Sequence, residues 1–567
     1  MTDGTQFFHI SPDWCGQDKL AELFRLNGHA VALWERGTLA EDIFYAEAAG
    51  SVPLAAYEGY ALIGGLYRHT PFWQPPLEAW RKFGYLARHF PHARFILTTR
   101  TVDGWLLDRL IRDKGRVARC YAYHLGVPVA DLPDLWERDW NDHLSQVDTF
   151  FGDDPRLIRV DLEACSPKDL ARRLAFPLAP AGDWQPPHPA APEAQLRGII
   201  DRGAVSKSAD RDYAEDIAQF CLAGLRLDEP GDDSALSPHA CLWDGAQSLT
   251  TQTGQESGVR ITDEGVAIWR PDLHFKVQRA AGVVNDILRM DRAMKLRIDM
   301  EDSRWIGSPQ GDVLQAPVLC HNRRVAARNV VLWPLPDVHS IGLPGFDPHA
   351  RRDSTPFDQK EDVVVWRGMI SGSEMRNSVR PGPASHVLLR QLSEAGSNQD
   401  TRSAVWDALS RTNRLNFVQR YFGHPDFNLG VVMAWGYREF AKDPLLAPYC
   451  RPAQAQKFFW RFRYQLCMTG YDHGSNFIPM IDSQSVMLKE EDGWEVFYSD
   501  RFRPWKHYIP LERYCTDIEE KLAWARENPN QCKEMSAAAR SECARLRDPA
   551  TRRLIMERIL DGLAAAG

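Results

Sequence analysis

Short apolar runs alternate with longer amphipathic stretches along most of the chain. In the N-terminal part, the runs in FFHISPDW and ARFILTTR predict buried strands, and each is followed by an amphipathic helical stretch. Further runs in the C-terminal half predict strands in the same way: GVAIW, MKLRID, NVVLW, DVVVW and SVMLK. Strands that alternate with helices pair in parallel and are covered by helices on both faces. The pattern therefore predicts an α/β protein built on parallel sheets.

Two turn-rich stretches interrupt this pattern. The first runs from Pro177 to Pro192, and its prolines indicate a semi-rigid linker. A helical segment follows it and leads to the second stretch, EPGDDSALSP. At 567 residues the chain is too long for one core. We therefore expect a domain over residues 1–185, a linker with a helical segment over 186–238, and a second module over 239–567.

The composition of the chain argues against several classes of protein. Lys and Arg total 68 against 76 Asp and Glu, and this net charge of −8 gives no electrostatic case for a nucleic-acid partner. No run of 18 apolar residues is present, and MTDGTQFFHISPDW lacks the basic and apolar regions of a signal peptide. Eleven cysteines without a CxxC spacing predict neither a disulfide framework nor a zinc site. We expect a cytoplasmic protein, at most in peripheral contact with the inner face of a membrane.

Four polar motifs follow one another in the C-terminal part. They read LRIDMEDSRW, DVVVWRGMISGSEMR, RYQLCMTGYDHGSNF and DGWEVFYSDRFRPWKHYIPL. The aromatic, basic segment that opens at residue 458 predicts a helix leading into the GYDHGSN loop, with a second helix after it. A loop that opens a helix beside a strand end is where α/β proteins hold phosphates.

In this order the motifs resemble the CAP10-like (family 90) glycosyltransferases. The resemblance implies a GT-B fold of two Rossmann-like halves. It also implies an inverting enzyme that moves a sugar, glucose or xylose, from a UDP-sugar to a hydroxyl of a bacterial envelope glycan or glycolipid, such as lipopolysaccharide or capsule. Two residues depart from the family pattern: Thr469 stands where an acidic residue is usual, and Tyr471 replaces an asparagine.

The resemblance also assigns roles to residues. An acceptor hydroxyl must lose its proton as it attacks the anomeric carbon, and Asp302 is the best match to the family's base. Asp299 and Glu301 are close enough in sequence to be confused with it, and an exposed acidic strand end is the alternative. The donor-binding residues that the resemblance implies are Arg367, Gly368, Ser371, Gly372, Arg376, Gly470, Asp472, Ser475, Asn476, Glu495 and His507. Of these, Arg367 or Arg376 would neutralise the leaving group.

No metal site is expected in this region. Metal-dependent sugar transferases usually carry an Asp-X-Asp string at a strand end, where oxygen ligands hold Mn²⁺ or Mg²⁺ against the diphosphate. Here the nearest strings, DRDY and DWND, fall in stretches that predict helices. Arginines and helix dipoles would then take the place of the metal, and no cofactor is needed beyond the UDP-sugar substrate.

The first strand, turn and helix of the chain resemble the sulfotransferases, which use 3′-phosphoadenosine 5′-phosphosulfate (PAPS). The resemblance covers about 175 residues and implies a P-loop-like domain. The family's phosphate-binding lysine is Trp14 here, and carboxylates stand at Asp18 and Asp108 where hydroxyls are usual. A carboxylate facing a phosphate raises the electrostatic cost of binding. The residues of this altered PAPS loop are Cys15, Gly16, Lys19 and Arg100.

Three hypotheses follow. The first is a glycosyltransferase whose N-terminal domain has lost its donor site and serves as a scaffold or acceptor-holding module. The second is a dual enzyme that also sulfates the glycan from PAPS, with Lys19 restoring the altered loop. The third is a non-catalytic scaffold in envelope assembly. Binding of UDP and of PAP, the desulfated form of PAPS, separates the three.

Overall fold

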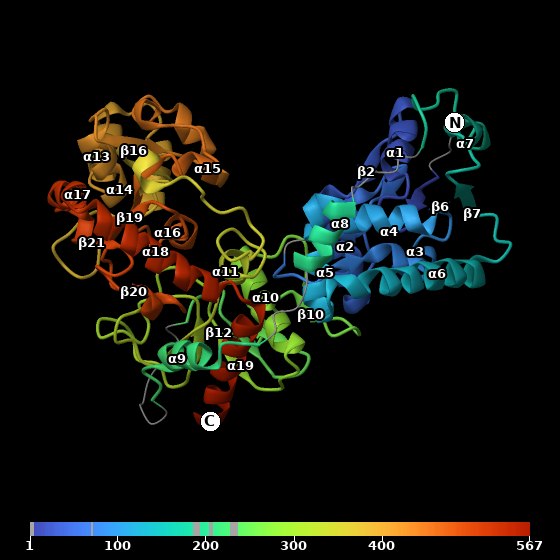
Figure 1. Ribbon diagram of the computed structural model, residues 1–567. Helices are drawn as coiled ribbons and strands as arrows, with labels where there is room; N and C mark the ends of the chain where they lie inside the picture. The colour runs from blue at the N-terminus through green and yellow to red at the C-terminus, as the bar shows by residue number, and fades with distance from the viewer. Residues whose placement is uncertain (1–4, 70–71, 185–192, 203–207, 227–235, 567) are drawn as a thin grey trace. The chain divides into compact units, whose positions relative to one another are not determined.

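The computed structural model describes residues 5–69, 72–184, 193–202, 208–226 and 236–566 (Figure 1). It is an α/β protein with parallel sheets, as the pattern predicted. Its contacts divide the chain into two compact units, Met1–Lys207 with Pro238–Ile298, and Ser208–Ser237 with Asp299–Gly567. The sequence placed residues 239–298 with the C-terminal module instead, so the domain boundaries stay a prediction. Within the expected linker over 186–238, residues 186–192, 203–207 and 227–235 lie outside the described residues.

The first unit is built on a five-stranded parallel sheet in the order β2-β3-β1-β6-β7. Apolar residues of these strands are buried on both faces, because helices pack against each side. The strands are β1 (Phe7–His9), β2 (Val31–Leu33), β3 (Leu62–Gly64), β6 (Arg94–Thr99) and β7 (Leu157–Asp161). The helices are α1 (Gln17–Leu26), α2 (Thr38–Ala49), α3 (Phe83–His89), α4 (Val102–Ile111), α5 (Arg116–Leu125), α6 (Leu132–Phe151), α7 (Pro167–Arg173) and α8 (Glu193–Arg202).

The remainder of this unit consists of short antiparallel pairs and one helix. Strand β8 (Cys241–Trp243) lies between β9 (Leu249–Thr251) and β12 (Leu296–Ile298). The pairs β4 (Tyr67–Arg68) with β5 (Leu77–Glu78) and β10 (Val259–Ile261) with β11 (Ala267–Trp269) complete the strands, and α10 spans Phe275–Arg289. The strands predicted from GVAIW and MKLRID are therefore confirmed as β11 and β12.

The second unit contains another five-stranded parallel sheet, in the order β17-β16-β18-β19-β21. Its apolar residues form one large core with the surrounding helices. The strands are β16 (Glu361–Gly368), β17 (Phe427–Val431), β18 (Phe462–Cys467), β19 (Val486–Glu490) and β21 (Ile509–Leu511). The helices are α12 (Ser385–Glu394), α13 (Gln399–Ser410), α14 (Asn413–Tyr421), α16 (Phe477–Ile481), α17 (Ile518–Glu527) and α18 (Pro529–Leu546) (Figure 1).

Smaller elements complete the second unit. Strands β13 (Val318–Cys320) and β15 (Val330–Leu332) pair in parallel, and β14 (Arg323–Arg324) pairs with β20 (Trp494–Glu495). The helices are α9 (Arg211–Leu222), which packs along α19 (Pro549–Ala566), together with α11 (Pro336–His339) and α15 (Gln456–Phe459). The predicted strands NVVLW, DVVVW and SVMLK are confirmed as β15, β16 and β19.

The helix predicted from residue 458 is wrong. Only α15 is helical there, and the following residues form β18, a central strand of the sheet. The GYDHGSN loop therefore leaves the carboxyl end of a strand. Among the described helices, none is both long and apolar enough to cross a bilayer. The GT-B arrangement and the sulfotransferase type of the first unit stay predictions.

Candidate functional site

The carboxyl ends of β16 and β18 meet at one edge of the second unit's sheet, because neighbouring strands in a parallel sheet point the same way. Arg414 of α14 joins the loops that leave these two ends. Its guanidinium donates to Ser371 Oγ at 2.5 Å and Met369 O at 3.1 Å after β16, and to Met468 O at 2.8 Å and Thr469 O at 3.0 Å after β18. Arg414 was not predicted as a site residue, because it lies outside the four motifs and no pattern in α14 distinguishes it from other arginines.

Two of the predicted glycines make this close approach possible. A Cβ at Gly470 would lie 3.0 Å from Arg414 Nη2 and 3.1 Å from Ser371 Oγ. A Cβ at Gly372 would lie 2.1 Å from Asn413 Oδ1, and the φ of +134° at Gly372 already favours glycine. Both glycines therefore admit protein side chains, whereas the resemblance implied that they bind the donor.

Asp302 follows β12 in the chain and lies beside the GYDHGSN loop. Its side chain is 41% exposed, whereas that of His321 is 5% exposed and that of Asp472 is 17% exposed. The imidazole Nε2 of His321 lies 3.8 Å from Asp302 Oδ1 and 3.6 Å from Asp472 Oδ2. The structure thus brings Asp302 and Asp472 together around a histidine that the sequence did not single out.

Asn322 is the buried centre of this cluster. Its Oδ1 accepts from the Arg304 backbone N–H at 3.1 Å, which fixes the orientation of the amide. Its Nδ2 lies 3.1 Å from Asp472 Oδ2 and 2.7 Å from His321 Nε2. With the amide in this orientation, Asn322 Nδ2 is the donor toward Nε2 of His321.

The two alternatives to Asp302 have structural roles. Asp299 is fully buried and accepts from the N–H and Oγ–H of Ser237 and from Glu301 N–H, while Arg304 Nε lies 3.1 Å from it. Glu301 accepts from the Asp302 backbone N–H at 3.1 Å. A base must reach a substrate proton. Asp302 therefore remains the carboxylate of this motif that is best placed to act as the base.

The same cluster could hold a cation on distance alone. One oxygen or nitrogen atom from each of Asp302, His321 and Asp472 lies within 4.8 Å of the other two. Carboxylate oxygens and imidazole nitrogens are ordinary metal ligands. However, the Asn322 amide already faces both Nε2 and Asp472 Oδ2. A cation at this position would compete with these two contacts of the Asn322 amide.

The two arginines expected at the leaving group lie in different settings. Arg367 donates to Trp366 O and Asn428 O, each at 2.8 Å, and to Asn428 Oδ1 at 2.6 Å. Burial, and then the neighbouring Arg451, lower the pKa of Arg367. Arg376 is exposed, and its Nη2 lies 3.4 Å from Glu374. The contacts of Arg367 hold β16 to β17, so Arg376 is the more available of the two.

The remaining predicted residues make varied contacts. Glu495 accepts from Arg323 Nε at 2.8 Å, within the β14–β20 pair. His507 is buried, its Nδ1 accepts from Arg503 N–H at 2.8 Å, and burial lowers its pKa to about 4. Ser475 is exposed, and Asn476 Nδ2 lies 2.8 Å from Met480 Sδ. Glu495 and His507 thus both have hydrogen-bond partners within the protein.

The side chain of Tyr471 contacts the first residues of α12. Its hydroxyl accepts from His386 N–H at 3.2 Å and lies 3.0 Å from Ser385 Oγ. The substitution noted in the sequence therefore ties the GYDHGSN loop to the helix that follows β16. These hydrogen bonds hold the loop against α12, with a tyrosine at the position where asparagine is usual.

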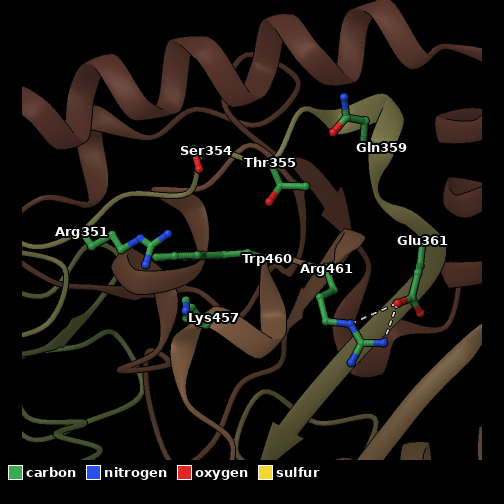
Figure 2. Close-up of a pocket in the computed structure, with 8 residues that line it drawn as sticks. All are labelled: Arg351, Ser354, Thr355, Gln359, Glu361, Lys457, Trp460 and Arg461. Carbon is green, nitrogen blue, oxygen red and sulfur yellow. Dashed lines mark hydrogen bonds and ion pairs between the residues drawn. The ribbon is translucent and has the colours of Figure 1, made fainter.

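The cavity in Figure 2 lies at the other edge of the same sheet. It has a volume of about 310 Å³ and lies beside Glu361, the first residue of β16, and Arg461, which precedes β18. These two side chains form an ion pair at 2.7 Å (Figure 2). Its lining residues are Arg351, Ser354, Thr355, Gln359, Glu361, Lys457, Trp460 and Arg461. None of them was predicted, and none lies at the β16–β18 carboxyl edge.

In the first unit, the altered PAPS loop is engaged with protein groups. Arg100 is buried and pairs with Asp108 Oδ2 at 2.5 Å. Lys19 Nζ lies 2.9 Å from both Glu22 Oε2 and Ala181 O. Cys15 is fully buried, and Gly16 precedes α1 with a φ of +77°. The basic groups that would face a phosphate are therefore paired with acceptors of the protein.

The C-terminal part of the chain is similar to known proteins. Residues 439–548 match the family model described as Glycosyl transferase family 90. Protein O-glucosyltransferase 3 of Rattus norvegicus is 31% identical over 78 residues, which are 14% of this chain and 15% of the relative. The human protein of that name is 26% identical over 130 residues, 22% of this chain and 24% of the relative.

A longer match extends the similarity. The O-glucosyltransferase rumi of Drosophila pseudoobscura pseudoobscura is 22% identical over 264 residues, which are 44% of this chain and 54% of the relative. The matched segments therefore span less than two thirds of each of these relatives. Within residues 439–548 lie the GYDHGSN loop and the motif that ends in HYIPL. The resemblance predicted from the motifs is confirmed for this segment, which matches the family 90 glycosyltransferase model.

Proposed function

We propose that this protein is an inverting glycosyltransferase that moves a sugar from a UDP-sugar to a hydroxyl group. The observation that carries the proposal is the exposed Asp302 carboxylate beside the family 90 loop, within a hydrogen-bonded cluster that holds it there. Glucose is the first candidate for the sugar, because the relatives are named O-glucosyltransferases. Xylose is the second candidate.

The proposed reaction is a single displacement. Asp302 accepts the proton of the acceptor hydroxyl while that oxygen forms a bond to the anomeric carbon. The bond from the anomeric carbon to the β-phosphate oxygen breaks, and its electron pair leaves with UDP. Attack opposite the leaving group inverts the anomeric configuration. Asp302 therefore acts as the general base.

Negative charge grows on the diphosphate as it leaves, and stabilising it is the main electrostatic demand of the reaction. The loop from Gly368 to Arg376 and the GYDHGSN loop line the carboxyl edge of the sheet, where α/β proteins hold nucleotides. We assign the charge-neutralising role to Arg376, because Arg367 is engaged with strand carbonyls. Metal-independent catalysis, a bacterial envelope glycan or glycolipid as the acceptor, and a cytoplasmic location stay predictions.

An assay of sugar release and transfer tests this function. Purified protein is incubated with UDP-glucose, UDP-xylose or UDP-GlcNAc and candidate glycan acceptors, and the anomeric proton of the product is followed by NMR. We expect transfer from one of the first two donors, with inverted configuration. Retention of configuration would contradict direct displacement, and failure to bind UDP would favour a non-catalytic scaffold.

A further inference from the structure

We propose that Asp472 is a positioning residue for Asp302 and does not bind the donor. This inference rests on the proposed function and assigns Asp472 a role that the sequence did not predict. Its basis is the set of contacts that Asp472 makes with the segment next to the base.

The carboxylate of Asp472 holds the backbone immediately after Asp302. Its Oδ2 accepts from Ser303 N–H at 3.0 Å and from Asn322 Nδ2 at 3.1 Å. Ser303 Oγ donates to Tyr471 O at 2.6 Å, so two hydrogen bonds join Ser303 to the GYDHGSN loop. The orientation of Asp302 is therefore set by the same loop that the family resemblance assigns to the donor.

The backbone at Ser303 needs this support. Its φ is +56°, in the left-handed region that a non-glycine residue rarely adopts because its Cβ is crowded there. A strained turn persists when several contacts determine it, and Asn322 adds another by accepting from Arg304 N–H. Asp472, Asn322 and Ser303 together hold a turn that places Asp302 at the surface of the cluster.

The two hydrogen bonds to Asp472 end on one oxygen, and this makes the role testable. An asparagine at 472 can place its Oδ1 where Oδ2 now lies and keep both bonds without the charge. An alanine loses both. Because a displacement of about 1 Å at a reacting group lowers the rate about 100-fold, the alanine variant tests positioning and the asparagine variant tests charge.

The experiment measures kcat, the KM for the UDP-sugar and the Kd for UDP by calorimetry, in the whole protein. We expect Asp472→Ala to lower kcat about 100-fold and to change the Kd for UDP by less than about twofold. Asp472→Asn is expected to restore kcat to within about tenfold of the wild type. Asp400→Ala, at an exposed position of α13, is the control and should leave every value unchanged.

Three results would overturn the inference. The first is an Asp472→Ala variant with unchanged kcat and a UDP affinity weakened tenfold or more, which would make Asp472 a donor ligand. The second is an asparagine variant as inactive as the alanine variant. The third is an Mn²⁺-dependent wild-type activity that is lost in EDTA and that needs at least tenfold more Mn²⁺ in Asp472→Ala, which would make Asp472 a metal ligand. If wild-type protein transfers no sugar at all, the proposed function fails as well, whereas unchanged activity of Asp472→Ala beside an inactive Asp302→Asn removes this inference alone.

Discussion

At the scale of single residues, some side chains of the candidate site could be predicted from the sequence and others could not. The family motifs identified Asp302 and Asp472, and the structure places both beside His321. The role of Asn322 could not be predicted, since one buried asparagine among many carries no local signal until its partners are known. Arg367 shows the reverse case. Its motif suggested that Arg367 binds a phosphate. In the structure its guanidinium donates to the carbonyl oxygen of Asn428 on the neighbouring strand instead.

A buried histidine of the first unit predicts a pH effect on stability. His143 donates from Nε2 to Ile10 O at 2.8 Å and packs against Trp80, and burial lowers its pKa to about 4 from an ordinary 6.5. The unfolded chain therefore binds the proton more readily. The stability from the neutral ring is complete above pH 6.5 and is lost as the pH falls toward 4, at about 1.4 kcal/mol per pH unit.

Unfolding at pH 7 and pH 5 checks this effect. We expect the wild type to lose about 2 kcal/mol more over this interval than His143→Gln, in which no ring can titrate. An equal loss in both proteins would show that His143 has the same pKa in the folded and the unfolded state.

At the scale of elements, the apolar runs predicted the most evident strands and missed many of the short ones. The five runs of the C-terminal half all became strands, from β11 to β19. The helix predicted from residue 458 is wrong, because Arg461 and Arg463 stand two positions apart and alternate with aromatic residues, which is the period of a strand. In the structure Phe462–Cys467 form β18, and the Arg461 and Arg463 side chains meet carboxylates near the amino edge of the sheet.

Arg414 gives a prediction at this scale, because it joins α14 to the loops after β16 and β18. Arg414→Ala leaves four acceptors of these loops without their donor. Removing hydrogen bonds to a charged group costs about 1.5–3 kcal/mol each where the acceptors stay buried. We expect a melting temperature lowered by several degrees and UDP affinity weakened at least tenfold, measured by calorimetry.

A lysine at the same position is the matched comparison. Arg414→Lys keeps the charge but offers a point donor instead of a planar fork, so it should recover only part of the affinity. If both variants bind UDP like the wild type, the β16–β18 edge does not hold the nucleotide.

At the scale of the whole molecule, two units with parallel sheets carry two different resemblances. The comparisons support the resemblance of the second unit, because residues 439–548 match the family 90 model. In the first unit, the sequence identified the substitutions in the PAPS loop, and the structure adds their consequence. Arg100 pairs with Asp108, and Lys19 pairs with Glu22. A phosphate bound there would meet the negative charge of these two carboxylates.

A thermal-shift comparison tests this difference between the units. A ligand at 100 times its dissociation constant stabilises a protein by about 2.7 kcal/mol, which raises the melting temperature measurably. We expect a shift with UDP and none with PAP or PAPS on the full chain. A shift with PAP would contradict the loss of the donor site and favour the dual enzyme.

The central claim is that Asp302 removes the acceptor proton, and the turnover of Asp302→Asn tests it most directly. An amide cannot take the proton but keeps the size of the side chain. We predict that kcat falls by at least about 100-fold while the Kd for UDP stays within about twofold of the wild type, and that Asp400→Asn behaves like the wild type. An Asp302→Asn enzyme that turns over at the wild-type rate would contradict the account.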